Sequence, residues 1–391
     1  MSKLEELIQQ YCPDGVEWKP LGEATIMKRG TSVTKGIMQE GNIPVISGGR
    51  QPAYYCNISN RTGEVITVAG SGAGAGYVQY WNEPIFVCDA FSIQGNETLK
   101  TKYVYYVLTS IQEKIYSTKK GGGVPHVHIS SIEKFEIPVP PLPVQEEIVR
   151  ILDNFTELQA ELQAELQKRK LQYNYYLDNL LNFNRGGYQA EVRWMKMSEV
   201  MSISRGASPR PIQNYLTDAD DGIPWIKIGD VSPSSKYISS TKEKIKKEGA
   251  TKSRYLKKGD FILSNSMSFG RPYILNIDGC IHDGWISMYG FEEHLDQDYL
   301  YYVLRSESVQ TFWTAKANSG GAVSNLNSDI VRNTLIPIPS MTEQKKIVSI
   351  LNRFDTLTND LTAGLPAEIE KRRQQYEYYR DKLLTFKRKA A

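Results

Sequence analysis

Residues 137–155 read IPVPPLPVQEEIVRILDNF, and residues 336–354 read IPIPSMTEQKKIVSILNRF. Each stretch leads to a similar ending, YNYYLDNLLNF at 173–183 and YEYYRDKLLTF at 376–386. The copies begin 199 residues apart (137 to 336) and end 203 residues apart (183 to 386), so the second copy carries four extra residues. A long segment that recurs about half a chain later predicts that the whole protein is built on an internal repeat.

Both copies are predicted to form long helices. Apolar residues recur in each copy at alternating spacings of 3 and 4, the heptad pattern of a helix that packs against another helix. The prolines before each copy preset an extended entry and give each helix a sharp start. One helix over residues 144–183 would be roughly 60 Å long, at about 1.5 Å per residue. The predicted seam consists of Ile148, Ile151, Phe155, Leu158 and Leu162 in the first copy and Ile347, Ile350, Phe354, Leu357 and Leu361 in the second.

Two interpretations account for these helices. A single amphipathic helix usually belongs to the core of its own domain. A helix of this length is too long for the interior of one small domain, and the pattern occurs twice. We therefore favour a paired coiled-coil spacer, in which each helix buries its seam against the other copy.

The four extra residues of the second copy lie near Ala363-Gly364-Leu365-Pro366. A four-residue insertion locally unwinds a heptad seam, and glycine and proline are poor residues for a helix interior. We expect the second helix to bend there and to restart with Pro366 in its first turn and Glu368 and Glu370 near its N-terminus.

The repeat extends beyond the helices. Arg29 corresponds to Arg205 and Asp89 to Asp283, whereas the loops between matched positions differ. Short β-rich runs punctuated by Gly, Pro, Asn and Ser predict strand-rich mixed domains. The predicted fold class is α+β, a tandem duplication of a strand-rich mixed domain followed by a long helix. The predicted boundaries are 1–143 for the first domain, with a short helix at 2–11, 144–186 for the central helix, 187–341 for the second domain and 342–391 for the distal helix.

The composition sets broad limits. The 391 residues give room for two or three domains. A net charge of +3 neither indicates nor excludes nucleic-acid binding, because a basic stripe can coexist with an acidic remainder. The four cysteines form no CxxC pair, so neither a disulfide framework nor a cysteine zinc site is expected. The charged, amphipathic start and the absence of a run of 18 apolar residues favour a cytoplasmic location.

A glycine-rich loop at 70–76, GSGAGAG, is similar to a dinucleotide-binding fingerprint, with Asp89 about 20 residues further on. Residues 77–84 are too few for the crossover helix that such a site needs. The second copy has Ser266-Met267-Ser268-Phe269-Gly270 in this place. We interpret the loop as a flexible segment close to a ligand backbone, and Asp89 as a structural hydrogen-bonding residue.

Other catalytic and metal signals are weak. His126-Val127-His128 is only half a metal site, and the second copy has Asn325-Leu326-Asn327, which loses metal affinity and keeps hydrogen-bonding side chains. Contacts with bases or phosphates would suit both pairs, and a solvated loop is the alternative. The chain has no Walker P-loop, GxSxG elbow, HExxH motif or Asn-Pro-Pro-aromatic tetrad. We therefore expect no catalytic residues and no metal site.

Over nearly its whole length the chain carries one ordered set of features. They are the duplication, the Pro-rich entries, Gln145 and Gln344 at the helix starts, the two Tyr-x-Tyr-Tyr motifs and the opening YCPDGVEW at 11–18. With these features the chain closely resembles the specificity subunit of type I restriction-modification enzymes. The resemblance implies two target-recognition domains, each reading half of a split double-stranded DNA target, and two helices that pack antiparallel as a spacer.

The resemblance also implies partners. Two methylation subunits would dock through the spacer helices and supply S-adenosylmethionine chemistry on adenine, so this chain itself would hold no cofactor. Restriction subunits would add ATP- and Mg-dependent translocation and cleavage. Two alternatives remain: a stand-alone adenine DNA methyltransferase with unrecognised motifs, and a coiled-coil assembly protein without a DNA role.

The candidate DNA contacts are cationic and amide side chains in the loops. Arg and Asn suit guanine and adenine edges, whereas Lys more often contacts the phosphate backbone. The first domain offers Lys28, Arg29, Arg50, Ser71, Lys119, Lys120, His126 and His128. The second offers Arg205, Lys227, Asn265, Ser266, Ser268, Arg271, Lys316, Asn325 and Asn327.

Overall fold

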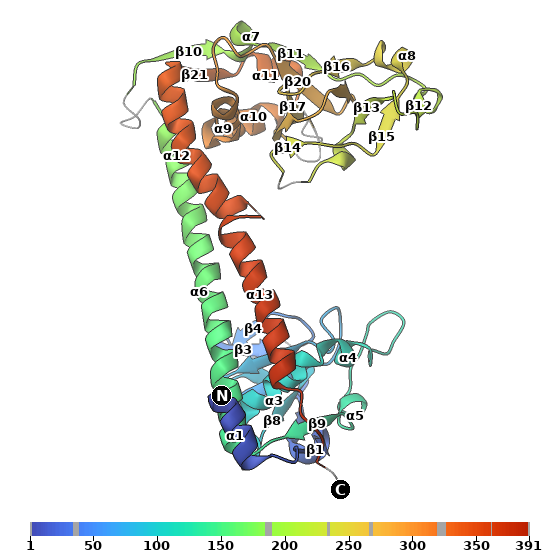
Figure 1. Ribbon diagram of the computed structural model, residues 1–391, viewed down its shortest axis with the longest axis vertical. Helices are drawn as coiled ribbons and strands as arrows, with labels where there is room; N and C mark the ends of the chain where they lie inside the picture. The colour runs from blue at the N-terminus through green and yellow to red at the C-terminus, as the bar shows by residue number, and fades with distance from the viewer. Residues whose placement is uncertain are drawn as a thin grey trace. The chain divides into compact units, whose positions relative to one another are not determined.

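The computed structural model describes residues 2–33, 39–183, 190–232, 235–265, 269–318, 326–360 and 362–389. Contacts divide the chain into two compact units, Met1–Gln163 with Ile369–Ala391, and Ala164–Glu368. Each unit therefore holds one domain and parts of both long helices (Figure 1).

The first unit is built on a small set of sheets and short helices. One sheet has the order β2 (Ile26–Arg29), β8 (Ala90–Gln94), β5 (Val65–Ala69) and β6 (Val78–Trp81). A second has the order β4 (Tyr54–Cys56), β3 (Ile43–Ile46) and β7 (Phe86–Val87), and β1 (Glu17–Pro20) pairs with β9 (Glu136–Val139). The helices are α1 (Lys3–Tyr11), α2 (Leu21–Ala24), α3 (Thr101–Ser110), α4 (Gln112–Tyr116), α5 (Ile129–Ile132), the start of α6 (Leu142–Leu181) and the end of α13 (Gly364–Leu383).

The core of the first unit lies between the β2-β8-β5-β6 sheet and helices α3 and α6. All five residues of β5 are buried, as expected for a β-branched central strand. Helix α3 contributes the buried rings of Tyr103 and Tyr106. The start of α6 adds Val144, Ile148 and Leu152 to the same core.

The second unit repeats this plan with additions. One sheet has the order β11 (Ser202–Arg205), β20 (Trp285–Tyr289), β17 (Phe261–Ser264), β18 (Pro272–Leu275) and β14 (Tyr237–Ile238). The other has the order β12 (Leu216–Thr217), β15 (Glu243–Ile245), β13 (Ile223–Ile226), β19 (Gly279–Ile281) and β16 (Arg254–Leu256), and β10 (Val192–Lys196) pairs with β21 (Leu335–Pro339). The helical segments are the end of α6, α7 (Met197–Val200), η2 (Ile212–Asn214), η3 (Ile228–Asp230), α8 (Lys247–Ala250), α9 (Gln297–Arg305), α10 (Glu307–Asn318), α11 (Ser328–Arg332), α12 (Met341–Asn359) and the start of α13 (Gly364–Leu383).

The strand orders confirm the predicted duplication. The order β2-β8-β5-β6 in the first unit corresponds to β11-β20-β17-β18 in the second. The stretch between β13 and β17 is longer than its counterpart between β3 and β5. It supplies β15, which pairs with β13 as β4 pairs with β3, and the additional elements β14, α8 and β16, so it widens both sheets of that unit. The α+β prediction is therefore correct.

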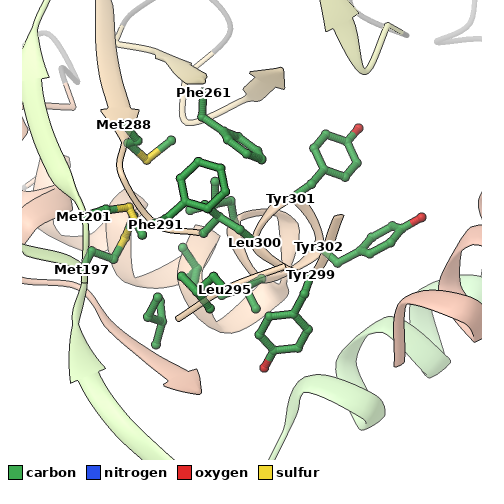
Figure 2. Packing of buried hydrophobic residues seen from close by; sticks show 14 of the residues in the cluster. Met197, Met201, Phe261, Met288, Phe291, Leu295, Tyr299, Leu300, Tyr301 and Tyr302 are labelled. Atoms are coloured by element: carbon green, nitrogen blue, oxygen red, sulfur yellow. The ribbon is translucent and has the colours of Figure 1, made fainter. Parts of the chain in front are cut away.

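Aromatic packing fills the core of the second unit. Figure 2 shows Phe261 and Phe291 beside Met288 and Leu300, and the two phenyl rings meet edge to face at 5.3 Å. The Tyr299 hydroxyl, buried here, donates to the carbonyl of Pro337 at 3.0 Å. The buried ring thus keeps its polar end satisfied.

Helix α6 spans 40 residues, which confirms the predicted long helix. In the first unit its Phe155 stacks on Tyr379, near the end of α13, with centroids 5.6 Å apart. In the second unit Tyr176, near the end of α6, stacks on Phe354 of α12 at 5.1 Å. Each unit thus joins the earlier part of one helix to the end of the other, as an antiparallel pair requires.

Where each helix packs against its own domain, the buried face of the helix differs from the predicted seam. Ile148 and Ile347 are fully buried, but they lie in the cores of the two domains. Ile350 is 38% exposed, and Leu351 is buried in its place. The domain covers these helices from one side and shifts the buried face by one residue. Half-buried positions are Ile151, Phe155, Leu158, Leu162, Phe354 and Leu357, and Leu361 lies outside the described residues.

The distal helix is interrupted where the sequence predicts it. Helix α12 ends at Asn359, and α13 begins at Gly364, whose φ is +76°. The Asp360 carboxylate accepts hydrogen bonds from the backbone N–H groups of Thr362 and Ala363, at 2.8 and 3.2 Å. The bond from the Thr362 hydroxyl, at 2.7 Å, and these two backbone bonds lower the pKa of Asp360. Together they hold the turn that precedes α13. Within the described residues, no helix combines the length and the hydropathy needed to cross a bilayer.

Candidate nucleic-acid interface

In the first domain, a hairpin places several candidate residues together. Backbone bonds join Lys120 and His126 in both directions, at 3.0 and 2.8 Å. The N–H of Gly72 donates to Pro125 at 3.0 Å, and that of Val127 to Gly70 at 2.9 Å. Backbone hydrogen bonds therefore hold the loop after β5 beside the 120–126 hairpin. The two segments together form a polar surface. The candidates that it unites are Ser71, Lys119, Lys120, His126 and His128.

Rings support the cations of this surface. The Arg50 guanidinium lies 5.0 Å from the centre of the Tyr77 ring, and Lys119 Nζ lies 4.1 Å from that of Tyr116. The rings of His126 and His128 stack at 6.0 Å with an angle of 5° between their planes. Exposed cations and flat rings held in place suit contacts with phosphates and bases.

Lys28 and Arg29 lie on β2. Lys28 is paired with Ser92, three residues after Asp89. In the second domain it is Arg205 that is paired with the residue three after Asp283, namely Ile286. Arg29 itself is paired with Phe91, and Phe91 and Ile286 are each the second residue of their strands, β8 and β20. The sequence match of Arg29 with Arg205 therefore holds in the ladder, and it is Asp283 that lies one residue further from its strand than Asp89 does.

In the second domain, Arg205, Asn265 and Asn327 line one pocket of about 410 Å³, together with His282 and Asp283. Arg205 Nε and Asn265 Nδ2 both donate to the Asp283 carbonyl, at 3.0 and 3.2 Å. The side-chain oxygen of Asn327 accepts from the N–H of Ile330 at 2.9 Å and so caps α11. This cap leaves the Asn327 amide nitrogen as the group that could meet a base.

The remaining candidates of this domain are dispersed. Lys227 borders a neighbouring pocket of about 560 Å³, and its Nζ lies 2.5 Å from Glu243 Oε1, so its charge is already paired. Arg271 lines a separate pocket of about 810 Å³ beside α12, and Lys316 lies on α10 with its Nζ 5.9 Å from the Phe312 ring. Ser266, Ser268 and Asn325 lie outside the described residues.

Asp283 lies at the centre of the second cluster, although no local sequence pattern marks it as a DNA contact. It lines both the 410 and the 560 Å³ pockets, and its Oδ1 accepts from Ser208 Oγ at 2.9 Å. Burial alone would raise the pKa of Asp283. The Ser208 bond and the charges of His282 and Arg205 outweigh burial, so the pKa lies below its ordinary value. The signal available in the sequence was its match with Asp89.

In the part of the chain that the structure describes, no group of three His, Cys, Asp or Glu side chains is arranged to hold a metal ion. The clusters instead combine Arg, Lys, Asn and His at loop edges, which suits non-covalent recognition of a polyanion.

Solved structures with this fold are similar over nearly the whole chain. A crystal structure of a type I restriction-modification S subunit from M. genitalium covers 95% of this chain and 96% of its own, with a TM-score of 0.60 and 17% identity. A structure from work on complex assembly and conformational transition of a type I restriction-modification system gives a TM-score of 0.64, with 95% and 97% covered and 17% identity.

Sequence comparison agrees with the fold. The type I restriction enzyme EcoR124I/EcoR124II specificity subunit of Escherichia coli is 32% identical, over 99% of this chain and 97% of its own length. A putative type I restriction enzyme specificity subunit of Haemophilus influenzae is also 32% identical, over 95% and 96%. The family described as type I restriction modification DNA specificity domain matches residues 13–169 and 190–371. The chain therefore belongs to the family of type I restriction-modification specificity subunits.

Proposed function

We propose that each of the two domains reads one half of a split double-stranded DNA target, and that the helices set the separation of the halves. The observation that carries this proposal is the duplicated scaffold with two different polar clusters. The first presents Lys, His and Arg beside tyrosine rings, and the second presents Arg, Asn and His around a pocket. Different side chains on similar scaffolds suit two different half-sites.

The proposal places catalysis on partner subunits. Two methylation subunits bring S-adenosylmethionine and act on adenine, and restriction subunits, where present, bring ATP and Mg. The chain itself acts as a recognition and docking subunit without a cofactor. The polar clusters support this division, because they offer Arg, Lys, Asn and His side chains that suit non-covalent contacts with DNA.

Two matching aromatic sites on the helices support docking of two copies of one partner. Tyr175 is 64% exposed and Tyr378 is 62% exposed, at equivalent positions of the repeat. Each ring meets the next tyrosine edge-on, at 5.6 Å in the first motif and 5.3 Å in the second, with 77° between the planes in both. Exposed tyrosines braced in this way are typical anchors of protein interfaces.

The test is single-molecule sequencing of adenine methylation in cells that carry this chain and its methylation subunit, against cells that lack only this chain. We expect a split, gapped motif that disappears with the chain. A continuous motif, or methylation that persists without the chain, would contradict the proposal and would favour a stand-alone methyltransferase elsewhere in the cell. A silent methylome with a methylation subunit that fails to co-purify would favour an assembly protein without a DNA role.

A further inference from the structure

Each domain has one aspartate in the segment that leads into an equivalent strand, β8 or β20. Asp89 immediately precedes β8, and Asp283 lies two residues before β20. The strand registers place Arg29 opposite the second residue of β8 and Arg205 opposite the second residue of β20, so the two aspartates differ by one position relative to their strands. They are therefore neighbouring counterparts at the entrance to equivalent strands, and the surrounding loops differ.

Different loops hold the two carboxylates in the same manner. Ser71, from the loop after β5, donates its hydroxyl hydrogen to Asp89 Oδ2. Ser208, from the loop after β11, donates to Asp283 Oδ1, and His282 Nε2 lies 3.0 Å from the same oxygen. In each domain a serine hydroxyl donates a hydrogen bond that fixes the orientation of the carboxylate, and the two serines come from unrelated loops.

The second oxygen of each carboxylate is left available. Among the described residues, no hydrogen bond is donated to Asp89 Oδ1, and Asp89 is exposed. Asp283 Oδ2 has a long contact of 3.5 Å with Arg210, whose own side chain is 83% exposed. Asp283 is 29% exposed and faces the pockets that Arg205, Asn265 and Lys227 line. Each domain thus aims one hydrogen-bond acceptor out of a cluster of donors.

A fixed carboxylate on a face that meets DNA is unfavourable unless it accepts a hydrogen bond, because the phosphate backbone repels it. The donors on base edges in the major groove are exocyclic amino groups, cytosine N4 and adenine N6. The adenine amino group is flanked by the acceptors N7 and thymine O4, which would repel a carboxylate. Cytosine N4 has such an acceptor on one side only.

We propose that Asp89 and Asp283 each read one base pair, one in each half-site, by accepting a hydrogen bond from an exocyclic amino group, preferentially that of cytosine. The inference rests on the proposed function and assigns a specificity-determining residue to each domain. The remaining Arg, Lys and Asn side chains of the clusters then supply the donors for phosphates and for purine edges.

A structural role for the aspartates is separable from this one. Asparagine has the shape of aspartate and can keep the serine bond through its oxygen. Its amide nitrogen then replaces the outward oxygen, so an acceptor becomes a donor. A base-reading aspartate therefore changes its preferred partner on substitution, whereas a purely structural one does not.

The experiment is methylation sequencing of cells carrying the full chain, its Asp89→Asn variant or its Asp283→Asn variant, each with the methylation subunit. Each variant is expected to alter one position in one half-site only. Sites with cytosine there should lose about tenfold or more in methylation relative to sites with other bases. Asp329→Asn is the matched control, because it removes an exposed charge on α11 beside the same pocket and should leave the motif unchanged.

Each outcome is decisive. An unchanged motif for both variants would overturn the inference, as would changes in both half-sites from one substitution, or variants that do not accumulate as folded protein. If the unsubstituted chain directs no split motif, the proposed function itself fails, which the first arm of the experiment shows independently of the variants.

Discussion

At the scale of single residues, different charges hold each domain to the helix that follows it. In the first unit Lys102 Nζ lies 3.1 Å from Asp153 Oδ1. In the second, the equivalent positions carry Asp298 and Asn352, whose side chains bond at 3.1 Å. The cation there is Lys236 from the longer loop, 2.6 Å from Asp298 Oδ1. The charged residues at each contact between domain and helix depend on one another. Replacing one of them by its counterpart from the other unit would leave a charge unpaired.

Glu147 shows how such a pair contributes to stability. Its side chain is only 4% exposed, and it binds Arg150 at 2.6 Å and Lys3 at 2.9 Å. The Arg150 hydrogen bonds, opposed by burial and reinforced by Lys3, lower the pKa of Glu147 to about 2. A pKa below the ordinary value of 4.5 means that the stabilisation is complete above pH 4.5 and is lost as the pH falls towards 2.

We therefore expect Glu147→Gln to lower the free energy of unfolding by about 2 kcal/mol at pH 7. The difference from the unsubstituted chain should shrink steadily below pH 4.5. Urea unfolding at pH 7, 4 and 3 measures it. Glu161→Gln, an exposed change on the same helix, is the control and should have little effect at any pH. A deficit that does not depend on pH would show that the ion pair is not its cause.

At the scale of elements, the turn between α12 and α13 requires glycine at position 364. Its φ is +76°, and a Cβ built on it would lie 2.3 Å from the carbonyl oxygen of Thr356 and 2.8 Å from that of Leu357. We expect Gly364→Ala to destabilise the second unit by about 1–3 kcal/mol, because both the backbone and the carbonyls must shift.

Thermal unfolding followed by circular dichroism checks this prediction. Gly229→Ala is the matched control, since a Cβ there meets no atom within 4 Å. Its melting temperature should stay close to that of the unsubstituted chain. Equal losses for the two variants would contradict a special role for the turn.

At the scale of the whole molecule, each unit has its own core, although α6 and the distal helix contribute to both. Ile148 and Ile347 are equivalent residues, each fully buried in one of the two cores. We expect alanine at either position to cost about 2–4 kcal/mol, through lost burial and the cavity left behind. The loss should be local: Ile148→Ala should speed amide hydrogen exchange in β5 and α3, and Ile347→Ala in β17 and α9.

Hydrogen-exchange mass spectrometry distinguishes two independent cores from one. Ile350→Ala provides the control, because it removes the same side chain one turn away, where it is 38% exposed. Faster exchange in both units after either core substitution would show that the chain unfolds as a single cooperative body.

The sequence by itself determined the features that depend on local chemistry and on the repeat. Proline entries and heptad spacing predicted the helices, and Gly364 with Pro366 predicted the interruption, because these residues act on the backbone within a turn or two. The duplication was evident from matched motifs alone, and with it the α+β class. The loops that assemble Ser71, His126 and their neighbours were also selected from the sequence.

Tertiary structure decided what depends on contacts between residues far apart in the chain. Packing of a domain on its helix buries Leu351 and leaves Ile350 exposed, and no helical period specifies which side the domain takes. The Glu243 carboxylate pairs with Lys227, 16 residues away, and ladder register sets Arg205 opposite Ile286. Asp283 is a candidate only because the fold brings Ser208, 75 residues away, to its carboxylate. A sequence pattern indicates the local conformational preference of a segment. The partner of a side chain, the buried face of a helix and the register of a strand depend instead on the free energy of the whole fold.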